Sequence, residues 1–259
     1  MRPWQWLVPV TTVATIAVNG MANALPIAGR LTGEISDSFP VVITPAGYVF
    51  AIWGVIYLGL AGYAVWQSLP AQATNRRAQA VAVPVAIGNL ANLVWILLWH
   101  HLWIGTSLVA MLVLLVTLML VYLRLRPLPG TALARGAVDR AERLWARGTF
   151  SVYLGWITVA TVANVTIALW DGGARERLLG LPPQAWGVVA LLVATALGAR
   201  MLQRYRDVAY AAVLVWAFVG IVVAQSSSVF VAATAVLGAL VLAYLTLTTL
   251  QRQKGAATA

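Results

Sequence analysis

The chain has 259 residues, of which 61% are hydrophobic and only 9% charged, a composition outside the range of soluble domains. This composition predicts an integral membrane protein. The chain has no cysteine, which excludes disulfides, thiolate nucleophiles and cysteine-ligated metals. The net charge of +10 would suit nucleic-acid binding, but the basic residues lie mainly in predicted loops, where they set topology and attract anionic lipids.

Eight apolar stretches follow one another along the chain. A helix needs roughly 20 apolar residues to cross the hydrocarbon of a bilayer. The stretches are 4–28, 46–68, 80–101, 105–123, 149–170, 185–202, 208–225 and 229–250. We therefore expect an all-α polytopic bundle of about eight transmembrane helices that forms a single membrane domain over residues 1–259.

The basic residues are distributed unevenly between the two sides of this bundle. Fourteen of the 17 lie in or beside the two tails and the connections 69–79, 124–148 and 203–207. The opposite side carries only Arg30, Arg175 and Arg177. The positive-inside rule then places both termini in the cytoplasm, with the protein in the inner or plasma membrane of the cell.

The first apolar stretch has a second interpretation. Arg2, the apolar run and the Ala22-Asn23-Ala24 sequence also fit a cleavable secretory signal, whose removal would leave seven spans. The run is long for a signal core, and Asn19 and Asn23 are amides that a discarded segment would not need. A retained first helix is therefore the favoured interpretation.

Polar groups inside the predicted spans are neutral. Every one of the seven acidic residues falls in a loop or at a span edge, so no proton relay or pair of catalytic carboxylates is expected within the bilayer. The buried amides are Asn19, Asn23, Asn89, Asn92, Asn164 and Gln225. Such amides join helices by hydrogen bonds more often than they contact ligands.

The only two histidines, His100 and His101, are adjacent at the outer end of the third span. This position indicates a polar cap at the interface rather than a metal or haem ligand. With no cluster of acids, histidines or nucleophiles, we expect neither a catalytic nor a metal site.

Three predicted helices each carry a narrow aromatic face, at about 100° of rotation per residue. The faces are Trp53 and Tyr57 in the second span, Asn92, Trp95, Trp99 and Trp103 in the third, and Tyr153, Trp156, Ala160 and Asn164 in the fifth. Trp53 and Trp95 lie roughly 10 Å inside the outer ends of their spans, deeper than an interfacial aromatic belt. Depth favours the wall of a pocket, with belt and core packing as the alternative.

Three motifs on these faces resemble a known family. The sequence PAGYVFAIWGVIY (45–57), Asn92-Leu-Val-Trp95, and Tyr153-Leu-Gly-Trp156 followed by Asn164 are similar to signatures of the TspO/translocator protein family, the tryptophan-rich sensory proteins (TspO/MBR). The resemblance covers residues 5–170. Residues 185–250 would then form three additional transmembrane helices of a longer member.

The resemblance implies five helices around a pocket for hydrophobic ligands, closed by the loop between the first two helices. The ligand-binding positions that it implies here are Trp53, Tyr57, Asn92, Trp95, Trp156, Ala160 and Asn164, with loop 29–45 as the lid. This chain departs from the family pattern before and after two of the motifs. Pro45 stands alone, Ala51-Ile52 replaces a second proline site, and Trp99-His100 replaces a phenylalanine pair, so the ligand itself is not fixed by the motifs.

These observations predict a TspO-like membrane protein that binds a planar or polycyclic ligand of the tetrapyrrole or sterol class. It would act as a sensor or carrier rather than an enzyme, and a tetrapyrrole would be a ligand rather than a resident cofactor. The expected partners are membrane lipids and a hydrophobic small molecule, not nucleic acid, and a homodimer is left open. Gly59 and Gly62 would permit close helix packing, with no particular partner indicated. The alternatives are a transporter or exporter of a lipid-soluble metabolite and an intramembrane enzyme acting on a porphyrin or isoprenoid.

Overall fold

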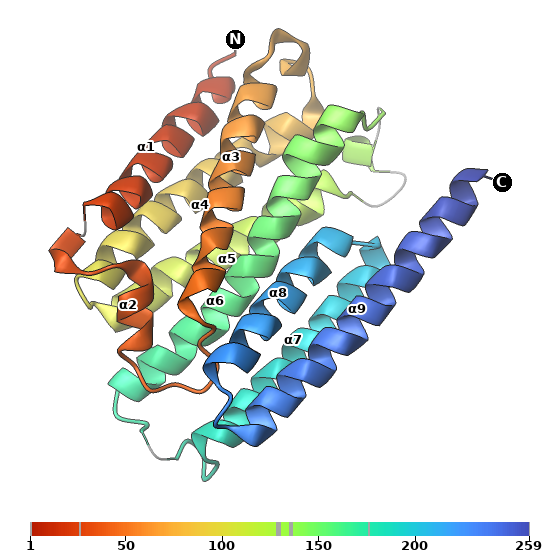
Figure 1. The fold of residues 1–259 in the computed structure, drawn as a ribbon. Coiled ribbons are helices and arrows are strands. Elements are labelled where there is room, and N and C mark those ends of the chain that lie inside the picture. The colour runs from red at the N-terminus through yellow and green to blue at the C-terminus, as the bar shows by residue number, and fades with distance from the viewer. Residues whose placement is uncertain (1, 26, 128–130, 135–136, 176, 259) are drawn as a thin grey trace. The chain divides into compact units, whose positions relative to one another are not determined.

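The computed structural model describes residues 2–25, 27–127, 131–134, 137–175 and 177–258, and its long elements are helices (Figure 1). Within these ranges the structure contains no strand, only an isolated bridge between Leu178 and Leu181. The helices are α1 (Trp4–Ala24), α2 (Thr32–Asp37), α3 (Ile52–Ser68), α4 (Arg76–His100), α5 (Ile104–Leu125), α6 (Thr149–Asp171), α7 (Pro183–Tyr205), α8 (Val208–Ala224) and α9 (Val229–Thr258).

Each of the eight predicted spans contains one apolar helix, and α2 is a short addition in the connection after α1. Seven of the helical segments in the described residues are long and apolar enough to cross a membrane, and α8, with 17 residues, is shorter. The prediction of an all-α polytopic membrane bundle is confirmed.

Side-chain caps explain where two helices begin. The Asn75 side-chain oxygen accepts hydrogen bonds from the backbone N–H groups of Arg77 (3.0 Å) and Ala78 (3.2 Å), so α4 begins at Arg76. Asp207 does the same for α8 by accepting from the Tyr210 N–H at 3.1 Å. Hydropathy placed the start of α4 four residues later because its first turn carries two arginines.

The chain forms two compact units. The first unit comprises Met1–Ile35 and Ala51–Ile157, and the second comprises Ser36–Phe50 and Thr158–Ala259. Helix α6 therefore contributes its beginning to the first unit and the remainder to the second. The expectation of a single membrane domain stays a prediction.

In the first unit, α4 packs against α1 and α5, and α1 packs against α3. Buried amides join these helices. The Gln5 and Gln67 side chains each donate to the other residue's carbonyl, at 2.9 and 2.8 Å, and the Asn89 amide donates to Thr12 at 3.0 Å. Because lipid offers no hydrogen-bond partners, these pairs satisfy groups that would otherwise be costly to bury.

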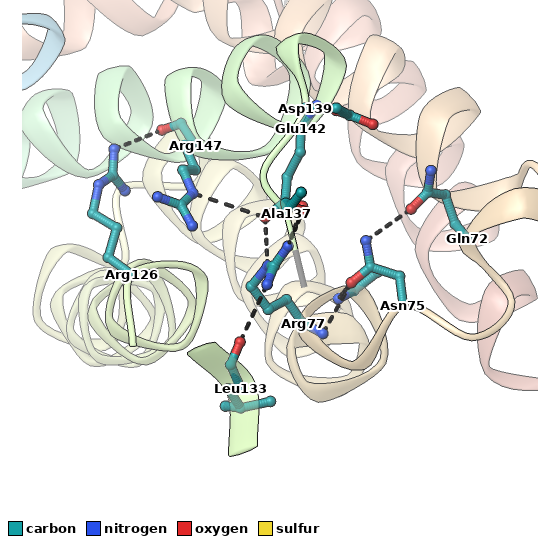
Figure 2. Close-up of polar contacts among 10 residues, drawn as sticks. Gln72, Asn75, Arg77, Arg126, Leu133, Ala137, Asp139, Glu142 and Arg147 are labelled. Atoms are coloured by element: carbon teal, nitrogen blue, oxygen red, sulfur yellow. Dashed lines mark hydrogen bonds and ion pairs between the residues drawn. The ribbon is translucent and has the colours of Figure 1, made fainter. Parts of the chain in front are cut away.

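A buried ion pair ties the start of α4 to the connection that precedes α6 (Figure 2). Arg77 contacts both carboxylate oxygens of Glu142, at 2.6 and 2.8 Å, and also donates to the carbonyls of Leu133 (3.2 Å) and Ala137 (2.9 Å). Arg77 is 4% exposed and Glu142 2%. Removing one partner of such a pair costs about 3–5 kcal/mol, because the other charge is left uncompensated.

Helix α3 approaches the start of α6 through two glycines. Gly59 lies against Thr149, and a Cβ atom on Gly62 would overlap the Trp145 ring. Trp145 belongs to a π-helical turn, Glu142–Gly148, that runs directly into α6. These glycines therefore contact their own chain, and they carry no argument for a dimer.

In the second unit, α8 packs against α7 and α9, and residues 36–50 run along α8. The backbone N–H of Ala46 donates to the Gly220 carbonyl (3.1 Å), and the Trp216 indole donates to the Val49 carbonyl (3.1 Å). A Cβ atom on Gly220 would overlap Val49, so glycine permits this close approach. The end of the expected lid itself is held by Gln225, directly after α8, whose side-chain amide donates to the carbonyls of Val41 (3.3 Å) and Thr44 (3.4 Å).

The glycine contact with Trp145 gives a prediction. Gly62→Ala should lower thermal stability in detergent, by about 1–3 kcal/mol of overpacking, because the added methyl group meets the indole ring. The matched control is Gly54→Ala on the same helix, where no atom lies within 4 Å of an added Cβ atom. There the better helix propensity of alanine should leave stability unchanged or raised. Equal melting temperatures for the two variants would contradict this packing.

Candidate ligand site in the first unit

Trp53 on α3 lies at the centre of a group of aromatic rings. Its ring stacks on Tyr57 (centroids 5.4 Å apart) and on Trp95 of α4 (5.9 Å), with interplanar angles of 19° and 26°. Tyr153 and Trp156 of α6 meet it edge-on at 6.0 and 6.2 Å. We call Trp53, Tyr57, Trp95, Trp99, Tyr153 and Trp156 the aromatic cluster. Three helices that are distant in sequence thus present their aromatic faces to one another, as the periodicity predicts.

The stack continues along α4 to Trp99, whose ring lies 5.8 Å from that of Trp95 at 24°. The predicted stripe ends there, because α4 ends at His100 and Leu102 has a φ of +57°. Trp103 lies beyond this turn and is 63% exposed. The expectation that Trp103 extends the same face is therefore wrong.

A chain of buried hydrogen bonds holds one side of the aromatic cluster. The Asn19 amide of α1 donates to the Asn92 oxygen of α4 at 2.8 Å, and the Asn92 amide donates to the Tyr153 hydroxyl at 2.7 Å. Asn92 thus has partners in the protein through both ends of its side-chain amide. In this arrangement it positions Tyr153 and joins three helices, which is the commoner of the two roles considered for such amides.

Within the aromatic cluster, Trp95 has a hydrogen-bond donor that is not used. Its side chain is 4% exposed, and its indole N–H has no hydrogen-bond partner among the described residues. An indole N–H can only donate, and leaving a buried donor unsatisfied costs about 1–3 kcal/mol. A ligand acceptor placed at this atom would recover that cost, whereas Trp53 and Tyr57, which are partly buried, offer ring faces.

The two remaining predicted positions, Ala160 and Asn164, lie on the part of α6 that belongs to the second unit. Asn164 is 2% exposed, and neither end of its amide has a hydrogen-bond partner in the described part of the chain. An unsatisfied buried amide suits ligand contact better than helix joining. The role of both positions at a ligand site stays a prediction.

His100 differs from the expected interfacial cap, because it is fully buried. Its Nε2 lies 3.0 Å from the Thr32 hydroxyl, its Nδ1 lies 3.1 Å from the Ile27 carbonyl, and the neighbouring Trp99 indole donates to the Thr32 carbonyl at 3.3 Å. These contacts fasten the connection after α1 to the end of α4. In the sequence, the only indication of this role is that Trp99 and His100 stand together directly after the third-span motif. Across the described ranges, no group of three or more His, Cys, Asp or Glu side chains could hold a metal.

The fold and the aromatic cluster together define a polytopic helical membrane protein with aromatic rings gathered between its helices. The family model described as "TSPO-like protein" matches residues 5–248, and the chain belongs to this family. The match runs past residue 170, where the motif resemblance ended, and continues into α9. Among the curated proteins and solved structures compared, none matches the chain.

The hydrogen bond to Tyr153 can be separated from its ring contact. Tyr153→Phe keeps the edge-on contact with Trp53 but removes the hydroxyl that accepts from Asn92. We expect a loss of about 1–3 kcal/mol in stability, because the Asn92 amide is left unsatisfied. Thermal denaturation in detergent measures this, with Tyr244→Phe, at an exposed position of α9, as the control. A Tyr153→Phe protein as stable as the wild type would show that the hydrogen-bond chain does not hold the aromatic cluster.

Proposed function

We propose that this TSPO-like membrane protein binds a planar hydrophobic ligand at the aromatic cluster, with Trp53, Tyr57, Trp95 and Trp156 as the walls. The ligand belongs to the polycyclic class that includes tetrapyrroles and sterols. The contact of Trp53 with four other rings, two stacked and two edge-on, carries this proposal.

The geometry of the rings favours the planar members of this class. Stacked or edge-on aromatic pairs contribute about 0.5–1.5 kcal/mol beyond area burial. A flat conjugated ligand that enters between Trp53 and Trp95 replaces one contact between the rings by two contacts between ring and ligand. Separating the two rings therefore costs little free energy once the ligand is bound. A puckered ligand cannot make both contacts. A tetrapyrrole therefore suits the stack better than a sterol, and an acceptor on its edge would meet the Trp95 N–H.

The chemistry of the aromatic cluster supports a sensor or carrier role rather than catalysis. Its polar groups are neutral indoles and phenols, and the amide of Asn92 beside it is engaged with Asn19 and Tyr153. Such groups orient and recognise a ligand but supply no base or nucleophile at neutral pH. Ala160 and Asn164 belong to the second unit, so their role as ligand contacts stays a separate prediction and adds nothing to the argument for the aromatic cluster.

Both termini are proposed to face the cytoplasm, because the basic residues concentrate on that side. The cysteine-free chain allows a direct test with single cysteines in two exposed connections. A membrane-impermeant thiol reagent applied to intact cells should label Ser227→Cys but not Thr74→Cys, and both should react after permeabilisation. The reverse pattern would invert the assigned orientation.

Ligand binding tests the aromatic cluster. Trp95→Ala combined with Trp156→Ala should weaken saturable tryptophan quenching by protoporphyrin IX or haem about tenfold or more, because two ring contacts are lost. The matched control combines Trp6→Ala with Trp103→Ala, two exposed tryptophans, so both proteins lose the same number of fluorophores. Adding a sterol to the porphyrin-bound protein then shows, from any recovery of tryptophan fluorescence, whether the sterol displaces the porphyrin.

Two outcomes would overturn the proposal. One is linear, non-saturating quenching of the wild type by both tetrapyrroles. The other is an equal dissociation constant in the cluster variant and the control, with both proteins folded. In either case the rings of the aromatic cluster would be packing alone.

A further inference from the structure

A cavity of about 330 Å³ lies wholly within the second unit. One wall is the later part of α6, with Thr161, Val165 and Trp170, and the opposite wall is the start of α7, with Trp186 and Ala190. Residues Pro40 and Val41 contribute a third side. The volume falls within the roughly 300–1,000 Å³ of small-molecule sites, and none of the described lining residues is charged.

The outer end of this cavity is built by short-range contacts. Leu178 and Leu181 exchange two backbone hydrogen bonds of 3.0 Å, and the Trp186 indole donates to the Leu178 carbonyl at 2.9 Å. The Trp170 ring meets Phe39 edge-on at 5.6 Å. Both tryptophans are therefore held by contacts within the second unit, and Trp186 uses its only donor there.

Thr161, at the other end, has an unsatisfied hydroxyl. It is 8% exposed, and its oxygen has no hydrogen-bond partner among the described residues. Thr166 on the same wall shows the usual alternative, because its hydroxyl donates to the Val162 carbonyl at 2.9 Å. Thr161 lies ten residues from the end of α6 at Asp171, which is roughly 15 Å along the helix. The hydroxyl of Thr161 is thus a polar group without a partner in a lining whose other hydroxyl, that of Thr166, is already bonded.

We propose that this cavity binds a neutral, elongated, lipid-soluble molecule with one hydroxyl or carbonyl oxygen, which hydrogen-bonds to Thr161 while the apolar body runs out to Trp170 and Trp186. A charged ligand would lose its hydration without a compensating partner. A plain hydrocarbon chain would leave the Thr161 hydroxyl unsatisfied. This site is separate from the aromatic cluster of the first unit, and it does not depend on the function proposed there.

The test uses 11-bromoundecan-1-ol as the probe, because bromine quenches tryptophan at short range. With its hydroxyl at Thr161, the extended chain is about as long as the lined stretch of α6, so the bromine would lie near Trp170 and Trp186. We expect saturable quenching of the purified protein in detergent. The variant with Trp170→Phe and Trp186→Phe should lose the saturable component, whereas Trp95→Ala with Trp156→Ala should keep it.

Two variants test the site itself. Thr161→Val keeps the shape of the side chain and removes the hydroxyl, so the dissociation constant for the alcohol should rise about two- to tenfold, while that for 1-bromoundecane should not change. Ala190→Leu should fill the cavity and abolish saturable quenching. The matched control, Ala196→Leu, lies at an exposed position of α7 outside the cavity lining and should bind normally.

Three results would overturn the proposal. Linear quenching of the wild type would mean that the probe only partitions into detergent. An unchanged isotherm for Ala190→Leu would place the probe elsewhere. Identical affinities of wild type and Thr161→Val for the alcohol would show that the Thr161 hydroxyl does not contribute to binding. This comparison can be made even if the Ala190→Leu protein fails to fold.

Discussion

Hydrocarbon cannot replace a missing hydrogen bond, and this constraint governs the internal organisation of both units. Polar side chains are paired across helices where they hold the structure together. Gln5 pairs with Gln67, Asn92 links Asn19 to Tyr153, and Arg77 meets Glu142 with two further carbonyls. Some buried groups nevertheless have no partner among the described residues. Two of them, the Trp95 indole and the Thr161 hydroxyl, are the groups to which we assign ligand contacts.

The aromatic cluster also shows why core packing and ligand recognition need not be alternatives in a membrane. Between helices in lipid the hydrophobic effect contributes little, so association depends on close packing and polar contacts. Trp53 supplies such packing by contacting rings from α4 and α6. The same flat faces are suited to a flat ligand, because stacking needs no directional partner.

Much of the architecture could be predicted from local patterns. Hydropathy located every apolar helix, and rotation of 100° per residue brought Trp53, Trp95 and Trp156 to facing surfaces. The errors come from features with distant partners. Arg77 and Glu142 are 65 residues apart, and nothing near either residue indicates that both are buried. His100 looked interfacial because its partners, Ile27 and Thr32, lie in another connection. Trp103 was misplaced because periodicity does not detect where a helix stops.

The π-helical turn Glu142–Gly148 has a consequence for how this chain can change in length. A π turn holds one more residue than an α turn, so it sets the rotation of everything before it relative to α6. Deleting one residue here would restore α geometry and rotate the preceding side chains by about 100°. Glu142 would then turn away from Arg77, and Trp145 from Gly62. Relatives that keep this ion pair and this glycine contact should therefore conserve the spacing between Glu142 and Tyr153.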